Sequence, residues 1–385
     1  MSIFKTILKL FGAFLIGGAF GLVIAMIIIC VFTDTSISEF LNKLVSANLS
    51  DTAGSFLVGV LSLLVSIPLI TIIHEGGHLI FGRLSGYKFV SFRIFNYTFI
   101  KKDGKIAIKP FSVAGTGGQC LLSPPDAEEA KIPVVWYNLG GVIANLVSIL
   151  IILPIFRMNI NPFVKEFGLI FILASAIMIV LNGIPLRISG ICNDGMNAIQ
   201  LRKNKEGKHG MLIQLRANAL IQEGIRPKDM PDEFFLMPKN IDYKDALQVS
   251  IPVMAASRLL DEGRIADARK SFEELYRHSA DIMPLYVKEI ACELTYIYLA
   301  EGEIDKAKEL YTKDLQKYVK TYFKVMSSKE RLLCAVALRM DNDPEKARGI
   351  YETLVSRRDH YLLQGEVKSD IALMKELLQS QEKAL

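Results

Sequence analysis

Residues 71–80 read Thr71-Ile72-Ile73-His74-Glu75-Gly76-Gly77-His78-Leu79-Ile80, which is the pattern His-Glu-x-x-His inside an apolar run. Residues four apart lie on one face of a helix, so His74 and His78 can point at the same spot. Two neutral imidazoles supply two of the three protein ligands that a catalytic zinc ion usually has. Glu75 stands beside them and can act as a general base toward water. The stretch therefore predicts a zinc site.

The surroundings of this motif favour a metal site over a chance match. The pattern itself is short, and it also occurs in helices that bind no metal. Here, however, the apolar run at 56–81 is long enough to cross a bilayer. Three ionisable groups inside a membrane helix are costly and usually serve a function. We therefore expect a metal site in the last turns of a membrane helix.

The composition separates the two halves of the chain. The chain has 385 residues, is 51% hydrophobic and carries a net charge of +5. Long uncharged runs fill its first half and charged helical patterns fill its second, so we expect a membrane domain followed by a soluble domain. Its 5 cysteines are widely spaced and form no Cys-x-x-Cys pair. This pattern indicates neither a disulfide framework nor a cysteine zinc site, and it fits reduced thiols.

Four apolar runs predict about four membrane helices, at 10–32, 56–81, 134–156 and 163–181. The first run is too long for a signal peptide. Lys5 and Lys9 precede it and place the N-terminus in the cytosol, because basic residues stay on that side. Four spans then leave the C-terminal half in the cytosol as well. We expect a multi-pass integral protein embedded in the lipid bilayer of a bacterial cell membrane, with both termini cytosolic.

A basic segment at 83–109 contains two short alternating stretches, at 88–94 and 105–109, and the turn pair Asp103-Gly104. Alternation and an Asp-Gly turn are typical of a β-hairpin. We predict a small β-hairpin at the membrane surface. Its exposed edge could hold an extended substrate peptide by strand addition. A solvated basic loop is the alternative.

The third metal ligand has three candidates, Asp194, His209 and Glu166. With four spans, Glu166 begins the last span on the far side of the membrane, and His209 lies in a basic soluble stretch. Asp194 follows a helix break and falls on the same side as the two histidines. We therefore prefer Asp194 as the third ligand, with His209 next.

Asn145 is a polar residue among the apolar residues of the 134–156 run. Its amide can hydrogen bond to a neighbouring helix, which is the commoner role of such a residue, or it can position the backbone of a substrate. The sequence leaves both roles open.

These motifs resemble the site-2 protease family of intramembrane zinc metalloproteases. The matching segments are His74-Glu75-Gly76-Gly77-His78, Gly141-Val142-Ile143-Ala144-Asn145, and Asn182-Gly183-Ile184-Pro185 followed by Asp194-Gly195. The resemblance covers about 55–200. It implies that His74, His78 and Asp194 bind Zn²⁺ and that Glu75 activates water. It also implies a substrate that is a membrane protein or peptide, cut in or near a transmembrane segment.

The C-terminal part repeats one spacing three times. A glycine or asparagine is followed five residues later by alanine and, four residues further on, by an aromatic residue: Gly263, Ala268 and Phe272; Gly302, Ala307 and Tyr311; Asn342, Ala347 and Tyr351. Such self-similarity indicates stacked helix pairs, and it resembles tetratricopeptide repeats, whose concave surface suits a protein partner. Coincidental spacing in an irregular helical domain is the alternative. Acidic residues interleaved with basic ones argue against nucleic acid as a partner.

Together these patterns predict a mainly α chain in four parts. They are an N-terminal membrane helix with an external loop at 1–54, a zinc metalloprotease membrane core at 55–200, a linker at 201–244, and a soluble tetratricopeptide-like helical repeat domain at 245–385. The expected activity is intramembrane proteolysis, with the repeats docking a substrate or a regulator. The alternative is a catalytically inactive membrane adaptor whose repeats recruit a protein. The interval from Asn182 to Asp194, which is longer than in the family pattern, is the feature that favours it.

Overall fold

The computed structural model describes residues 36–39, 42, 49–102, 105–111, 116–188 and 190–382. The expected first membrane helix at 10–32, and most of the loop after it, lie outside these residues. The chain divides into two compact units, which are described one at a time. One comprises residues up to Gly77 together with Leu139–Ile184, and the other comprises His78–Asn138 and Pro185–Leu385.

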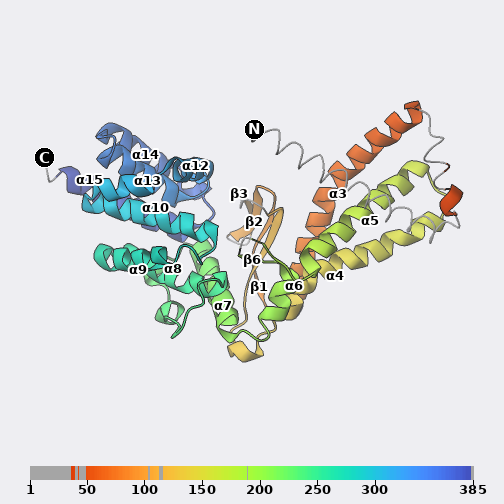
Figure 1. Cartoon of the computed structure of the whole chain (residues 1–385), viewed down its shortest axis with the longest axis horizontal. Helices are drawn as coiled ribbons and strands as arrows, with labels where there is room; N and C mark the ends of the chain where they lie inside the picture. Colours follow the sequence, from red (N-terminus) through yellow and green to blue (C-terminus); the bar gives the residue numbers. More distant parts are fainter. Residues whose placement is uncertain are drawn as a thin grey trace. The chain divides into compact units, whose positions relative to one another are not determined.

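Three long apolar helices are shown in Figure 1: α3 (Leu49–Leu84), α4 (Val135–Ile152) and α5 (Pro162–Gly183). The stretches long and apolar enough to cross a membrane are Leu57–Leu84, Glu129–Arg157 and Pro162–Gly183. They correspond to the last three apolar runs expected from the sequence. The described part of the chain therefore has three candidate membrane-spanning helices.

Local sequence sets the ends of α5. The Asn161 side chain accepts a hydrogen bond from the backbone N–H of Phe163, and Pro162 occupies the first turn, where a missing N–H costs nothing. At the other end the helix stops at Gly183, because Pro185 forces the residue before it into an extended conformation.

The helix pair α3–α4 is close-packed at Gly77. A Cβ atom at this position would lie 2.2 Å from the carbonyl oxygen of Gly140 and 2.6 Å from the Cβ atom of Ala144. The first distance is to backbone, which cannot move aside as a flexible side chain can. Gly76, its neighbour in the metal motif, has nothing within 4 Å of the same point. Of the two glycines, only Gly77 is required by packing.

The second unit contains a four-stranded antiparallel sheet with the strand order β3-β2-β1-β4. Its strands are β1 (Lys88–Ile94), β2 (Tyr97–Lys102), β3 (Lys105–Pro110) and β4 (Gly118–Ser123). The solvated loop considered above is therefore wrong.

The predicted β-hairpin is part of a larger sheet. We expected 88–94 and 105–109 as its strands, but β2 lies between them and pairs with both. The sequence analysis missed β2 because Thr98, Phe99 and Ile100 do not alternate cleanly between polar and apolar. It missed β4 because that strand reaches β1 only through a long-range pairing.

Helix α7 (Lys205–Glu223) packs against strand β4, and it lies inside the segment 201–244 assigned to a linker. Leu122 of β4, and Leu212 and Leu215 of α7, share one buried apolar cluster with Tyr87. Burial of such side chains contributes roughly 1.5–3 kcal/mol each, so α7 and the sheet stabilise one another.

Eight helices follow α7 and share one large apolar core. They are α8 (Ala246–Asp261), α9 (Ile265–Arg277), α10 (Pro284–Glu301), α11 (Ile304–Leu310), α12 (Lys313–Tyr322), α13 (Ser327–Arg339), α14 (Pro344–Arg357) and α15 (Gln364–Glu382). In Figure 1 they form the group coloured from green-cyan to blue.

The repeated sequence positions have matching roles in three helix pairs, α8–α9, α10–α11 and α13–α14. Gly263, Gly302 and Asn342 lie in the turns and have positive φ angles of 76°, 81° and 53°, a conformation that glycine and asparagine adopt at least cost. The alanines that follow, Ala268, Ala307 and Ala347, are all fully buried. The short helix α12 interrupts the series. The resemblance to tetratricopeptide repeats stays a prediction.

We expect Gly77→Ala to lower the thermal unfolding midpoint of the detergent-purified protein. Its methyl group collides with the α4 backbone, and such overpacking typically costs about 1–3 kcal/mol. Gly76→Ala is the matched control and should leave the midpoint unchanged or raise it, since alanine is the better helix former by about 1 kcal/mol. Circular dichroism during heating measures both. Equal midpoints for the two variants would contradict the packing at Gly77.

Candidate metal centre

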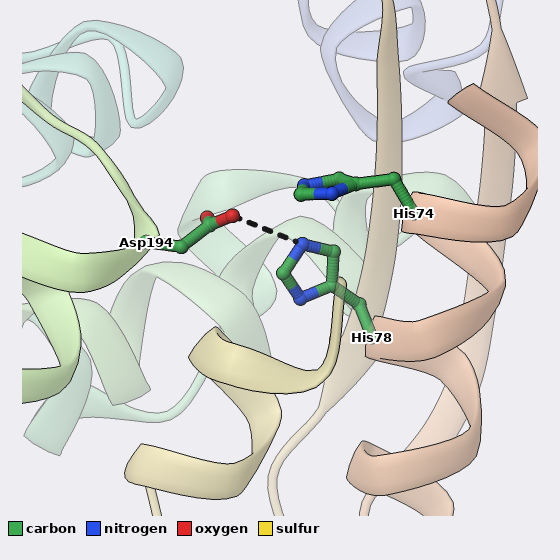
Figure 2. A group of neighbouring side chains, drawn as sticks. All are labelled: His74, His78 and Asp194. Carbon is green, nitrogen blue, oxygen red and sulfur yellow. Dashed lines mark ion pairs between the residues drawn. The ribbon is translucent and has the colours of Figure 1, made fainter. Parts of the chain in front are cut away.

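His74 and His78 are both buried near the C-terminal end of α3, at 5% and 8% exposure. One turn of a continuous helix separates them, so helix geometry alone places their imidazoles on one face. Figure 2 shows both rings on the side of α3 that faces Asp194.

Asp194 begins α6 (Asp194–Gln200) and approaches His78 directly. Its Oδ2 atom lies 3.4 Å from Nε2 of His78 (Figure 2). One potential ligand atom from each of His74, His78 and Asp194 lies within 4.8 Å of the others. Two imidazole nitrogens and one carboxylate oxygen form a donor set that suits zinc and leaves a coordination position open. The residues present thus fit the metal that the sequence predicts.

A small hairpin folds the long interval before Asp194. Strand β5 (Arg187–Ile188) pairs with β6 (Ile191–Cys192), and Gly190 near its tip has a φ angle of 87°. Asn193 then fixes the return of the chain, because its Oδ1 atom accepts hydrogen bonds from the N–H groups of Leu186 and Met196. The additional residues reverse the chain and end at the N-terminus of α6. The length of the interval therefore does not keep Asp194 away from His78.

The backbone carbonyl of Tyr137 orients His78. Its oxygen lies 2.7 Å from Nδ1 of the imidazole. A carbonyl can only accept a hydrogen bond, so Nδ1 of His78 carries a hydrogen, and in the neutral imidazole the lone pair is on Nε2. Metal-binding histidines are typically held in this way by an acceptor on the other ring nitrogen. The lone pair is on the nitrogen that faces Asp194.

Asn145 of α4 is in the equivalent position next to His74. It is fully buried, and its Nδ2 atom lies 3.2 Å from Nδ1 of the imidazole. Its Oδ1 atom has no hydrogen-bond partner among the described residues. A half-turn of the amide exchanges the two atoms. Oδ1 would then accept from Nδ1 of His74, leaving Nε2 free for a metal and giving the oxygen its missing partner. The predicted contact of Asn145 with a substrate stays a prediction.

The remaining sequence candidates lie apart from this group. Glu75 is buried beside His74 on α3 and contributes no atom to the set of three ligands. His209 on α7 hydrogen bonds through Nδ1 to Glu129 at 2.9 Å. Glu166 lies on α5, where its Oε1 atom would be 3.8 Å from a Cβ atom at Gly59 of α3. Among the described residues, the three-ligand group contains neither His209 nor Glu166.

Sequence reasoning missed the carbonyl of Tyr137. Every residue has a carbonyl, so the sequence carries no signal that one of them will meet a histidine 59 positions away.

Comparisons of the chain with protein-family models, with curated proteins and with solved structures gave no match.

We expect about one zinc per chain in the detergent-purified protein, as for a three-ligand site. His74→Ala and Asp194→Ala should each lose most of it, because each removes one ligand. His209→Ala is the matched control and should keep it, since that side chain is bound to Glu129. Mass spectrometry measures the zinc content of the wild type and of each variant. Full zinc in Asp194→Ala, or its loss in His209→Ala, would contradict the assignment of the third ligand.

Asn145→Ala should weaken zinc binding about 10- to 100-fold, the usual effect of losing a group that orients a histidine ligand. Asn138→Ala is a matched control on the same helix, because the Asn138 amide donates to the carbonyl of Val134 and not to a histidine. Competition with a fluorescent zinc chelator measures both affinities. Equal losses in the two variants would indicate a general packing effect.

Proposed function

We propose that this protein is an intramembrane zinc metalloendopeptidase that cuts a peptide bond in or near a transmembrane segment of a membrane protein or peptide. The observation that carries the proposal is the convergence of His74, His78 and Asp194 at a helix long and apolar enough to cross a membrane. A group of ionisable side chains in such a helix is costly, and its usual compensation is a metal or a reaction.

In this proposal His74, His78 and Asp194 hold the zinc ion. When bound, zinc supplies Lewis acidity that polarises a peptide carbonyl and acidifies water. The carbonyl of Tyr137 keeps Nε2 of His78 available, and the Asn145 amide, with its oxygen turned toward His74, would do the same for that imidazole. Asp194 contributes a negative charge that offsets part of the charge of the ion.

Glu75 is the general base. Its side chain is buried next to His74 and is not needed as a ligand. It accepts a proton from the attacking water and passes it to the leaving nitrogen of the cut peptide bond. A buried position keeps bulk water from competing for that proton.

A substrate must present an extended backbone, although the bilayer keeps helices fully hydrogen-bonded. The outer strand β3 offers a place for an unwound segment, because its far edge has no strand beside it among the described residues. Ile106 and Ile108 on this strand are 78% and 59% exposed. An exposed apolar edge strand is unusual unless it has a partner. Strand addition at β3 is the expected mode of substrate binding.

The remaining expectations belong to the same proposal. The chain would be a multi-pass protein of a bacterial cell membrane with four spans and both termini in the cytosol. Its C-terminal helices would act as a tetratricopeptide-like domain that docks a substrate or a regulator. The catalytically inactive adaptor stays the alternative. The peptidase proposal is supported by Asp194 lying 3.4 Å from His78 despite the long interval, which contains the β5–β6 pair.

We expect Glu75→Gln to keep bound zinc and to lose cleavage by about 100- to 10,000-fold, because only the base is removed. The assay uses liposomes containing the wild-type protein or the variant and a panel of quenched fluorescent transmembrane peptides. The metal content of each preparation is the control. Cleavage by Glu75→Gln at the wild-type rate would refute the mechanism, and zinc-loaded wild type that cuts no peptide would refute the proposed activity.

A further inference from the structure

A cavity of about 270 Å³ lies among the C-terminal helices, lined by residues of α7, α8, α10, α13 and α15. None of its lining residues belongs to the metal centre or to the sheet. Its volume is close to the lower end of the range of small-molecule sites. The two sides of the cavity differ in chemistry.

One side of the cavity is apolar. It is formed mainly by α7, α8 and the loop between them, with the side chains of Ile221, Met230, Phe235, Val253, Met254 and Leu260. Methionine side chains adapt to ligands of different shape. This wall suits an aliphatic or aromatic group of one or two amino-acid residues.

The other side carries charged groups from α10, α13 and α15. Arg331 pairs with Glu293 at 2.6 Å and with Asp370 at 2.9 Å. Lys329, just behind the wall, pairs with Glu289 at 2.5 Å. Glu366 also lines the cavity and has no ion-pair partner among the described residues. Four carboxyl groups therefore lie near two cations. Even with Glu366 protonated, three carboxylates remain for two cations, and this excess of negative charge favours a cationic ligand.

Arg331 provides a second, independent indication of a ligand. Its side chain is only 4% exposed, and its Nη1 atom has no hydrogen-bond partner among the described residues. A buried guanidinium N–H without an acceptor is costly. Arg331 lines the cavity, its guanidinium stacks on the ring of Tyr296 at 4.2 Å, and Nη1 itself is covered, so a ligand carbonyl would satisfy this N–H after a small shift of the side chain.

The raised pKa of the Glu366 carboxyl is consistent with a site for a cationic group. Burial, together with the nearby Asp370 and Glu289, raises the pKa of Glu366 to about 8. Much of this carboxyl is therefore protonated at neutral pH without a ligand. A cation beside it would favour the ionised form and lower that pKa.

We propose that this cavity binds the free amino terminus of a peptide whose first residue is apolar. The α-ammonium group pairs with Glu366, the carbonyl of the first residue accepts from Nη1 of Arg331, and the apolar side chain packs against Met230, Phe235 and Met254. A free amino acid has the same α-ammonium, but its carboxylate would enter a cavity that already has excess negative charge. The neutral carbonyl of a peptide avoids this cost. The site is separate from the metal centre and does not rest on the proposed peptidase activity.

The test is isothermal titration calorimetry on the full-length wild-type protein in detergent. The probes are the dipeptide amides Leu-Ala-NH₂ and Phe-Ala-NH₂, their N-acetylated forms, Gly-Ala-NH₂, and free leucine. We expect saturable binding of at least one apolar dipeptide amide. Its acetylated form should bind at least tenfold more weakly, because a charge-assisted hydrogen bond contributes about 1.5–3 kcal/mol. Gly-Ala-NH₂ should also bind more weakly, since it has no side chain for the apolar wall.

Two variants place the binding at this cavity. Glu366→Gln keeps the shape of the side chain and removes its charge, so it should weaken binding of the dipeptide amide about tenfold. Glu376→Gln, on an exposed position of the same helix α15, should bind as the wild type does. The comparison of free and acetylated peptides needs no variant, so it tests the proposal even if Glu366→Gln does not fold.

Three results would overturn the proposal. They are no saturable binding of either apolar dipeptide amide, equal binding of the free and acetylated forms, or tighter binding of leucine than of the amides. The last would assign the cavity to a free amino acid. These peptide-binding measurements do not depend on zinc or on cleavage at the metal centre. The peptidase proposal and the amino-terminus proposal can therefore be refuted independently.

Discussion

The candidate centre depends on one requirement: two histidines must present the same ring nitrogen, Nε2, to one point. Helix α3 supplies the spacing, but spacing alone leaves each imidazole free to rotate and to choose its tautomer. Helix α4 restricts that freedom through a contact with each Nδ1. The carbonyl of Tyr137 accepts from His78, and the amide of Asn145 lies against His74, where it accepts once its oxygen and nitrogen are exchanged. The α3–α4 contact must be close for this, and Gly77 against the backbone of Gly140 allows it.

The third ligand reaches the centre by a different route. Asp194 is not on a long apolar helix but at the start of the short helix α6, after the hairpin β5–β6. Asn193 accepts hydrogen bonds from the residue before the hairpin and from the first turn of α6, so the backbone next to Asp194 is held locally. A carboxylate beside two imidazoles is well suited to a cation, whereas without one it would meet only neutral or weakly charged rings.

The two proposals share one chemical feature. Cleavage within an apolar segment leaves a fragment with a free amino terminus and an apolar first residue. The cavity between α8 and α15 combines an apolar wall with a carboxyl and a guanidinium N–H that have no partner in the part of the chain that the structure describes. These groups match such an end. The C-terminal helices would then recognise a product of the kind of reaction proposed for the membrane helices.

The sequence by itself determined what depends on neighbours along the chain. Helical periodicity placed His74 and His78 on one face, hydropathy indicated three of the candidate spans, and the repeated spacing marked the turns at Gly263, Gly302 and Asn342. Only the tertiary structure decided which of Asp194, His209 and Glu166 joins the three-ligand group. It also gave Asn145 and Tyr137 their contacts with the imidazoles. The strands β2 and β4 of the sheet and the cavity at Arg331 likewise became known only from it. The physical reason is that periodicity and turn preference act over a few residues. A ligand set, a histidine acceptor or a cavity wall joins atoms from distant parts of the chain, and packing alone selects which of many equivalent groups will meet.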